Sequence, residues 1–262
     1  MKVTVLGCGG SGGVPLIGNN WGSCNPDNPK NRRRRCSLLV ERRRGKDVTR
    51  VLIDTGPDLR DQLIDAKVNW LDGVLYTHEH ADHTHGIDDL RGLVLHKRRR
   101  VDVYADDATS RMLMTRFSYC FVRPAGSEYP PILNMHELKP GAEISIAGPG
   151  GPIVALPFLQ DHGDIQSLGF RFGDVAYSSD LHDVPDASLA ALTGLDLWIV
   201  DALRPFPHPS HFSVADALSW IERLEPRRAV LTNMHTDLDY EVLRLSVPAG
   251  VEPAYDGMQI EA

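Results

Sequence analysis

Short apolar runs and helical repeats divide the chain into many small elements. Runs rich in Val, Ile, Leu and Phe predict strands at residues 3–6, 37–41, 50–54, 73–76, 101–104, 153–158, 168–172, 175–178, 195–200 and 228–232. Apolar positions that recur every three to four residues predict helices at 59–66, 82–96, 107–119, 186–192 and 214–224. Both halves show strands followed by strand-helix alternation, with 168–178 as a hairpin. This order predicts an α/β (α+β) protein with two mixed sheets and helices outside them.

The helix expected at 214–224 has the clearest pattern. Ser213 and Asp216 are placed like the two members of a capping box at its start. One face of the helix is apolar and carries Val214, Ala217, Leu218, Ile221 and Leu224. We therefore expect this helix to pack on a sheet through that face.

The glycine-rich segment Gly7–Gly12 fits the pattern G-x-G-x-x-G after a predicted strand. A dinucleotide-binding site would need a helix to open there, but Pro15 and the further glycines at 18–22 disfavour one. We therefore interpret the segment as a turn whose backbone approaches a neighbouring strand or the active centre closely.

Length and composition indicate one ordinary globular domain, residues 1–262. No Pro/Ser/Gly linker divides the chain, and 42% hydrophobic with 24% charged residues allow a sizeable core. No run approaches the roughly 18 apolar residues of a membrane span, and the N-terminus alternates like a strand rather than a signal peptide. Four scattered cysteines suit a reducing compartment and argue against disulfides. We expect a cytoplasmic protein with no membrane partner.

The charge balance argues against a protein that wraps nucleic acid. The chain has 28 Lys and Arg against 35 Asp and Glu, a formal charge of −7. Basic runs at 32–35, 42–44 and 97–100 are better explained as solvated faces or hairpin edges than as a patch for a phosphate-bearing ligand. These runs are left without a function at this point.

The segment Thr77–His83 concentrates potential metal ligands. His78, His80, Asp82 and His83 fall within six residues, directly after the predicted strand 73–76. Two histidines two residues apart share a face of extended chain, whereas Asp82 and His83 begin the next element and point elsewhere. The spacing therefore favours two ions rather than one.

One short loop cannot complete two coordination spheres, so other strand ends must contribute. His162, Asp180 and His235 each lie at or just after a predicted apolar strand. Singly, each is more often a hydrogen-bonded loop residue than a ligand. They become candidate ligands because they occur in the same chain as the cluster from His78 to His83.

Together these residues closely resemble the metallo-β-lactamase fold superfamily of metal-dependent hydrolases, over nearly the whole chain. The resemblance implies a four-layer αββα sandwich with the site at one edge between the sheets. It also implies that His78, His80 and His162 bind one metal ion, that Asp82, His83 and His235 bind a second, and that Asp180 bridges both. Asp54 corresponds to a carboxylate that orients a ligand histidine.

A narrower resemblance is to the phosphodiesterase branch that includes the phosphoribosyl 1,2-cyclic phosphate phosphodiesterases of phosphonate breakdown. It rests on the segments 12–15, 83–91 and 208–212. The structural zinc of that branch is held by a tight cysteine cluster, whereas here Cys24 is followed only by the distant Cys36. We therefore do not expect that zinc, and the pathway's own substrate is less firmly indicated.

A dinuclear centre suits hydrolysis of a small phosphodiester, cyclic or nucleotide-like. Two divalent ions lower the pKa of a shared water and neutralise phosphate charge in the transition state. Zinc is favoured by the histidine-rich set, with manganese or iron as alternatives. We expect Asp82 to act at the catalytic centre and His211 to protonate the departing alkoxide, with His208 as the second choice.

Further residues are expected near the substrate or behind the ligands. They are Asp54, His85, Asp88, Asp89, Arg91 and His182. For all except Asp54, simple solvation or packing is an equally good interpretation.

Three rival functions share the ligand set or the fold. A ribonuclease of the tRNA 3′-processing kind would need a long basic arm, and no such insertion stands out. Thioester or β-lactam hydrolysis, and a non-catalytic protein of the pyrroloquinoline quinone biosynthesis type, are the others. We expect a small-molecule substrate rather than extended nucleic acid, and a homodimer because oligomers are common in this superfamily.

Overall fold

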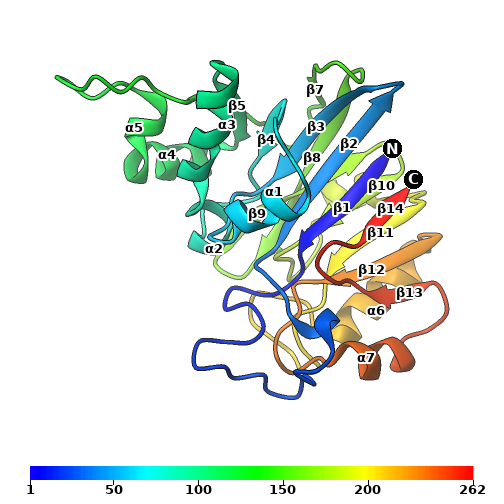
Figure 1. Ribbon diagram of the computed structural model, residues 1–262. Helices are drawn as coiled ribbons and strands as arrows, with labels where there is room; N and C mark the ends of the chain where they lie inside the picture. Colours follow the sequence, from blue (N-terminus) through cyan, green and yellow to red (C-terminus); the bar gives the residue numbers. More distant parts are fainter. Residues whose placement is uncertain (262) are drawn as a thin grey trace.

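Two seven-stranded β-sheets face each other in the computed structural model, which describes residues 1–261 (Figure 1). The first sheet has the strand order β14-β1-β2-β3-β4-β5-β6. Its strands are β1 (Lys2–Gly7), β2 (Ser37–Arg44), β3 (Asp47–Ile53), β4 (Gly73–Leu75), β5 (Val101–Ala105), β6 (Leu133–Glu137) and β14 (Gln259–Glu261). The strands β3 to β6 run parallel to one another, so their carboxyl ends meet at one edge of the sheet.

The second sheet has the strand order β13-β12-β11-β10-β9-β8-β7. Its strands are β7 (Ile144–Ile146), β8 (Ile153–His162), β9 (Ile165–Phe172), β10 (Val175–Ser178), β11 (Leu197–Asp201), β12 (Arg228–Thr232) and β13 (Val251–Pro253). The strands β10 to β13 are parallel, and β9 and β10 form the predicted hairpin. The prediction of two mixed sheets is confirmed.

Helices lie on the outer faces of both sheets (Figure 1). The α-helices are α1 (Leu59–Asp65), α2 (Ala81–Thr84), α3 (Leu90–Lys97), α4 (Asp107–Arg116), α5 (Ser118–Phe121), α6 (Val214–Leu224) and α7 (Tyr240–Ser246). Short 3-10 helices are η1 (Pro29–Asn31), η2 (Ile87–Asp89) and η3 (Asp186–Leu192). None of the helices in the described residues is both long and apolar enough to traverse a lipid bilayer.

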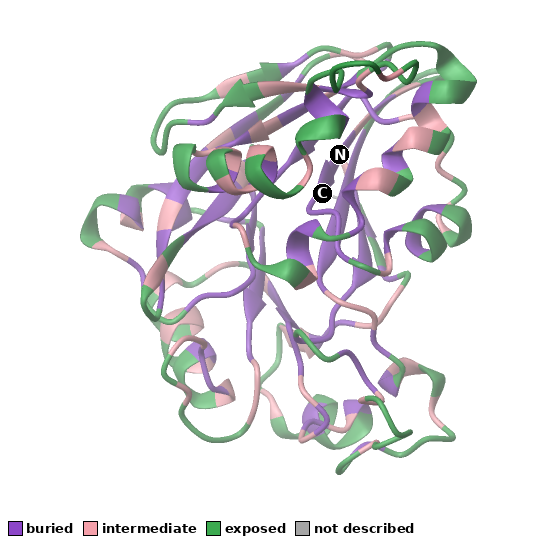
Figure 2. Ribbon diagram, turned by 90° about the vertical axis from the view of Figure 1, so that its left-hand side faces the viewer, coloured by how far each residue is buried: buried purple, intermediate pink, exposed green. Residues whose placement is uncertain are grey.

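Strands of the first sheet bury both of their faces, each against a different core. In β3, Val51 and Ile53 belong to the core between the two sheets, whereas Leu52 points to the core beneath the helices. The same alternation separates Val40 from Leu39 in β2, because successive side chains of a strand point to opposite faces. Figure 2 shows these strands as the buried centre of the molecule, with the exposed faces of the helices turned outward. The sandwich is thus four layers deep.

The predicted helix at 82–96 is wrong as a single element. The structure divides it into α2, η2 and α3, and the break falls at Gly86. A Cβ atom on Gly86 would collide with the carbonyl oxygen of Gly56, so the chain must pass this point without a side chain. The stretch predicted as a helix at 186–192 forms the 3-10 helix η3 instead.

Four short strands, β6, β7, β13 and β14, were not predicted. Each has only three to five residues, too few to show a clear alternation. By contrast, α6 has the predicted bounds, and the capping box formed by Ser213 and Asp216 is present. The glycine-rich turn is also as interpreted, because a Cβ on Gly7 would meet the carbonyl oxygen of Arg35.

We predict that Ser213→Ala lowers the free energy of unfolding by about 1 kcal/mol, the usual value of an N-cap hydrogen bond. The Ser213 hydroxyl accepts from the backbone N–H of Asp216 at 3.2 Å, and the alanine leaves that N–H without its partner. Urea unfolding measures the change. Ser219→Ala, on the exposed side of the same helix, is the control and should change stability by less than about 0.5 kcal/mol. Equal losses in both variants would contradict the assigned cap.

Candidate metal centre

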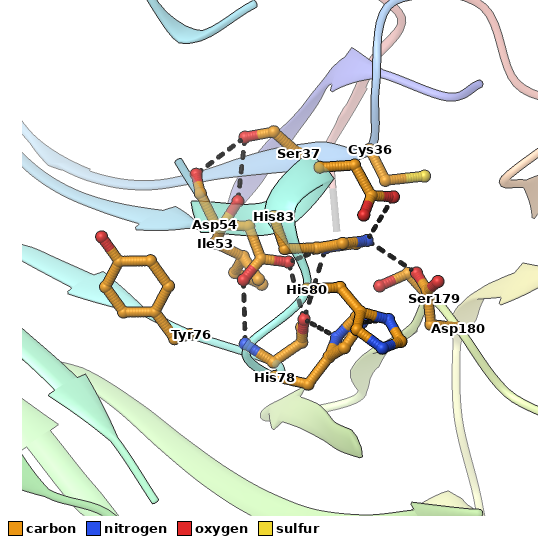
Figure 3. A network of polar contacts seen from close by, with 12 residues as sticks. Cys36, Ser37, Ile53, Asp54, Tyr76, His78, His80, His83, Ser179 and Asp180 are labelled. Carbon is orange, nitrogen blue, oxygen red and sulfur yellow. Dashed lines mark hydrogen bonds and ion pairs between the residues drawn. The ribbon is translucent and has the colours of Figure 1, made fainter. Parts of the chain in front are cut away.

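Strand ends from both sheets bring five imidazoles and several carboxylates to one edge of the sandwich. His78 and His80 follow β4, and His83 lies on the short helix α2. His162 is the last residue of β8, and Asp180 follows β10. Figure 3 shows His78, His80, His83 and Asp180 turned toward one another. The strand ends of both sheets therefore deliver residues distant in sequence to one place.

Three residues at these strand ends adopt the left-handed backbone conformation. The φ angles are 63° at Asp54, 51° at Asp180 and 61° at Asn233, each just beyond β3, β10 or β12. Asp and Asn enter this region more readily than other side chains. These residue types therefore allow the chain to turn sharply immediately after each strand.

The first group of possible ligands consists of three imidazoles. Nε2 of His78 lies 3.0 Å from Nδ1 of His80, and Nε2 of His162 lies 3.4 Å from the same His80 atom. One nitrogen from each of the three rings lies within 4.8 Å of the other two. Three converging nitrogens are the protein ligands that a catalytic zinc site commonly uses.

Asp180 lies between this group and the remaining rings. Its Oδ2 is 3.0 Å from Nε2 of His83, and its Oδ1 is 3.7 Å from Nε2 of His162. Asp82 lies on the other side of His83, with Oδ2 3.4 Å from Nε2. Asp180 therefore faces both the group of three imidazoles and His83.

The outer nitrogens of His78, His83 and His162 each have a hydrogen-bond partner. Nδ1 of His83 donates to Asp54 at 2.7 Å, and Nδ1 of His162 donates to the carbonyl of Ser210 at 2.6 Å. Nδ1 of His78 lies 2.9 Å from the hydroxyl of Thr77, which itself donates to Asp54. These bonds fix the tautomers and leave the Nε2 lone pairs facing inward.

The inward-facing atoms fit a cation. Asp180 is nearly buried, and its Oδ2 has no hydrogen-bond partner although Nε2 of His83 lies 3.0 Å away. With the proton of His83 on Nδ1, two lone pairs face each other across that distance. Buried acceptors without donors are unfavourable, and a divalent ion would satisfy both.

The pKa shifts reflect the same need for positive charge. Burial lowers the pKa of His78 well below its usual value, and the neighbouring His83 lowers it further. Burial also disfavours protonated His83, but Asp180, Asp54 and Asp82 outweigh burial and hold its pKa well above the usual value. Burial raises the pKa of Asp180, yet His83 reverses this and brings it well below the usual range. The carboxylates around His83 thus require a positive charge at this point, which a bound cation would supply.

The structure corrects the expectation that His235 is a metal ligand. Nδ1 of His235 pairs with Asp237 at 2.8 Å, the side chain is 37% exposed, and within residues 1–261 it joins none of the His/Asp groups. His211 lies there instead, with Nε2 3.8 Å from Oδ1 of Asp180. The residue directly after β12 is Asn233, so the imidazole two positions later has already turned away.

Asp201 and Asn233 are functional candidates that the sequence analysis missed. Asp201, the buried last residue of β11, accepts from Nδ1 of His211 at 2.7 Å and from the N–H of Leu181 at 2.9 Å. Asn233 donates to the same oxygen at 3.3 Å. Burial lowers the pKa of His211, but Asp201 overrides this and raises it to about 9. An acidic residue ending a long apolar strand was a signal that could have revealed Asp201.

His208 and His182 border the centre without joining it. The ring centroid of His208 is 5.0 Å from that of His211, and its Nδ1 accepts from the N–H of Ser210. Both histidines line a cavity of about 330 Å³ together with Trp220. Their place is compatible with contact to a substrate.

The expected phosphate-positioning residues lie at the end of α2, on η2 and on α3. Arg91 pairs with Asp88 at 2.6 Å, and Asp89 is exposed. His85 is exposed and lies edge-on to Phe117, 5.5 Å between ring centroids. In the described chain none of these four predicted residues belongs to the His/Asp groups.

All four cysteines are buried and unpaired, and none belongs to the His/Asp groups in residues 1–261. The thiol of Cys24 donates to the carbonyls of Thr236 and Leu238. Cys36 lies 3.8 Å from Oδ1 of Asn233, just behind the centre. Both thiols therefore pack the N-terminal loop against the strand end after β12.

A two-sheet sandwich with a His/Asp cluster at the strand ends defines the metallo-β-lactamase fold. The model of the family described as "Beta-lactamase superfamily domain" matches residues 49–234, well over half of the chain. The chain therefore belongs to the β-lactamase superfamily.

Two solved structures are similar over the whole chain. A diphosphatase of the PhnP family is 35% identical, with a TM-score of 0.88, and the match covers 100% of this chain and 97% of that one. This confirms the narrower resemblance inferred from the sequence. The zinc-bound PqqB of Methylobacterium extorquens is 18% identical, with a TM-score of 0.76 and full coverage of both chains, and it shows the fold alone.

A curated relative is longer than this chain. An octanoyltransferase of Porphyromonas gingivalis is 33% identical over an alignment of 264 positions, which covers 99% of this chain and 51% of that protein. The chain spans about half the length of this relative. The name describes the whole of that longer protein.

We predict that His162→Ala lowers the metal retained after dialysis to half of the wild-type content or less, because one of three converging nitrogens is lost. His235→Ala is the matched control and should retain the wild-type content. Elemental analysis of protein loaded with zinc and dialysed without chelator gives both values. A loss in His235→Ala as large as that in His162→Ala would restore His235 as a ligand.

Proposed function

We propose that the protein is a dinuclear metal-dependent hydrolase of small phosphodiesters. The observation that carries this proposal is the position of Asp180, whose two oxygens lie near imidazoles of two different groups. His78, His80 and His162 would hold one ion, and His83 with Asp82 the other. Such ions supply an activated water and neutralise phosphoryl charge when they are bound.

The protein's own residues supply orientation and a proton. Asp54 holds His83 through a 2.7 Å bond and receives the N–H and hydroxyl of Thr77 at 2.8 Å each. The ligand rings therefore cannot rotate away without breaking buried hydrogen bonds. A rigid set of ligands is what positions a diester for in-line displacement.

His211 is the proposed general acid. Its Nδ1 is bound to Asp201, so Nε2 is the nitrogen that faces Asp180 and the space above the centre. Asp201 favours the protonated ring and raises its pKa to about 9 after burial has lowered it. A proton held on Nε2 near the reacting phosphate would be transferred to the departing alkoxide.

Hydrolysis of a diphosphate is the second candidate. The observation that favours it is the 35% identical structure described as a diphosphatase. A diphosphate also carries a phosphorus with a bridging oxygen as the leaving atom, so the same centre could serve both. The phosphate that leaves from a diphosphate needs less help from a general acid than an alkoxide does. This difference in acid dependence separates the two candidates.

The proposal also covers the identity of the metal ion, the cellular location, the substrate class and the oligomeric state. Zinc is the favoured ion, since imidazole outnumbers carboxylate in the first group, with manganese or iron as alternatives. A cytoplasmic location is proposed because the four cysteines, all buried, are free thiols. A small-molecule substrate and a homodimer also remain proposals.

We predict turnover of bis(4-nitrophenyl) phosphate and of at least one cyclic phosphodiester, with no turnover of a thioester or a β-lactam. Dialysis against a chelator should abolish activity, and zinc or manganese should restore it. Asp180→Ala should abolish both activity and metal retention, because its carboxylate contacts both groups. Turnover is measured by the absorbance of released nitrophenolate, by chromatography of the opened cyclic diester, by the thiol released from the thioester and by the absorbance of the lactam. Turnover of the thioester or lactam alone would refute the proposed bond class.

We predict that His211→Ala slows a diester with a poor alcohol leaving group by about 10²-fold or more, the usual contribution of a general acid. The same variant should change the rate with a nitrophenyl leaving group far less, because nitrophenolate departs without a proton. Metal content is measured in parallel, with His208→Ala as the control. Equal losses on both substrates, accompanied by loss of metal, would make His211 a ligand instead of an acid.

A further inference from the structure

A second cavity lies at the opposite end of the first sheet from the metal centre. The metal ligands follow the carboxyl ends of β3 and β4, whereas this cavity lies at the amino ends of β3, β4 and β5. It has a volume of about 360 Å³ and is lined by Val48, Arg50, Asn69, Trp70, Asp72, Lys97, Arg99 and Pro149. The basic run 97–100, left unexplained by the sequence, thus contributes to a defined hollow.

Trp70 forms the aromatic wall of this cavity. It is partly buried against the core beneath the helices, and its indole N–H donates to Asp72 at 3.2 Å. The guanidinium of Arg99 lies over the ring, with Cζ 5.4 Å from the centroid. Packing and the hydrogen bond hold the ring in place, and the arginine provides a second planar group beside it.

The lining of the cavity contains three basic side chains and one acid. Among the described residues, Lys97 forms no ion pair within 4.0 Å, whereas Arg50 is paired with Glu41 at 3.0 Å and Arg99, over Trp70, also acts on the carboxylate of Asp102. Asp72 is the one acid in the lining of the described chain, and its oxygens already accept from the N–H of Arg50 and from Trp70. Lys97 and Arg99 therefore make one side of the cavity basic in a protein whose formal charge is −7.

Helix capping accounts for only part of this charge. Lys97 ends α3 and Arg98 is its C-cap, where cations interact favourably with the helix dipole. The dipole gives no reason for Arg99 to lie over Trp70, whereas Arg50 is held on the other side of the hollow by Glu41. A ligand that needs both cations and an aromatic surface would use Lys97, Arg99 and Trp70 together.

We propose that this cavity binds a nucleoside phosphate. Its phosphate would interact with Lys97 and Arg99, and its base would stack against the Trp70–Arg99 pair. The volume lies in the range of small-molecule sites and suits one nucleotide rather than a longer strand. Since no His or carboxylate group of the metal centre reaches this end, the site binds without hydrolysing.

The test is a fluorescence titration of the intact, metal-loaded protein with AMP. The expected result is quenching of tryptophan fluorescence, which Trp70→Phe abolishes. The double variant Lys97→Gln/Arg99→Gln should weaken binding at least tenfold, whereas Lys46→Gln, on the nearby β2–β3 turn outside the lining, should not. Thermal unfolding confirms that each variant is folded. Because hydrolysis is not the readout, the result stands apart from that of the proposed phosphodiesterase activity.

Three results would overturn the proposal. Ribose 5-phosphate or inorganic phosphate binding as tightly as AMP would show that no base is recognised. A single-stranded oligonucleotide binding at least tenfold more tightly than AMP would make this end a surface for a nucleic-acid strand. An unchanged affinity in the double variant would place AMP binding elsewhere on the protein.

Discussion

Buried carboxylates that require positive charge are the constraint on which the catalytic edge depends. Asp54, Asp180 and Asp201 are all buried, and a lone carboxylate in such a place is strongly unfavourable. Each is paired with an imidazole: His83 contacts the first two, and His211 contacts the last two. Imidazoles serve here because they can donate outward and keep a lone pair inward. Metal ions at the centre would add the positive charge that these carboxylates still require.

The arrangement of the two sheets brings their strand ends together at this edge. Parallel strands β3 and β4 end beside β10, β11 and β12 of the other sheet, so their following residues share one volume. Positive φ angles at Asp54, Asp180 and Asn233 turn the chain immediately after its strand. Residues that adopt this conformation with little strain are thus also the residues that provide oxygen atoms. Backbone geometry and chemistry select the same amino acids.

The sequence predicted the fold and most of the cluster because both depend on local patterns. Strand periodicity and the short spacing from His78 to His83 need no knowledge of distant contacts. The positions of His211 and His235 did need such knowledge. His235 follows an apolar strand and His211 precedes a helix, and only the three-dimensional paths of the loops show that His211 lies against Asp201 while His235 pairs with Asp237. The missed break at Gly86 has the same origin, since it reflects a collision with a segment 30 residues away.

The arrangement also couples the ligands to the proposed acid. Nδ1 of His162 donates to the carbonyl of Ser210, and the next residue along the chain is His211. The ring of His162 therefore positions this loop from one side, while Asp201 holds the imidazole of His211 from the other. A displacement of His162 would move the loop and with it the proton donor. Ligand geometry and the proposed proton donation thus both depend on one short segment, which is anchored at His162 and at Asp201.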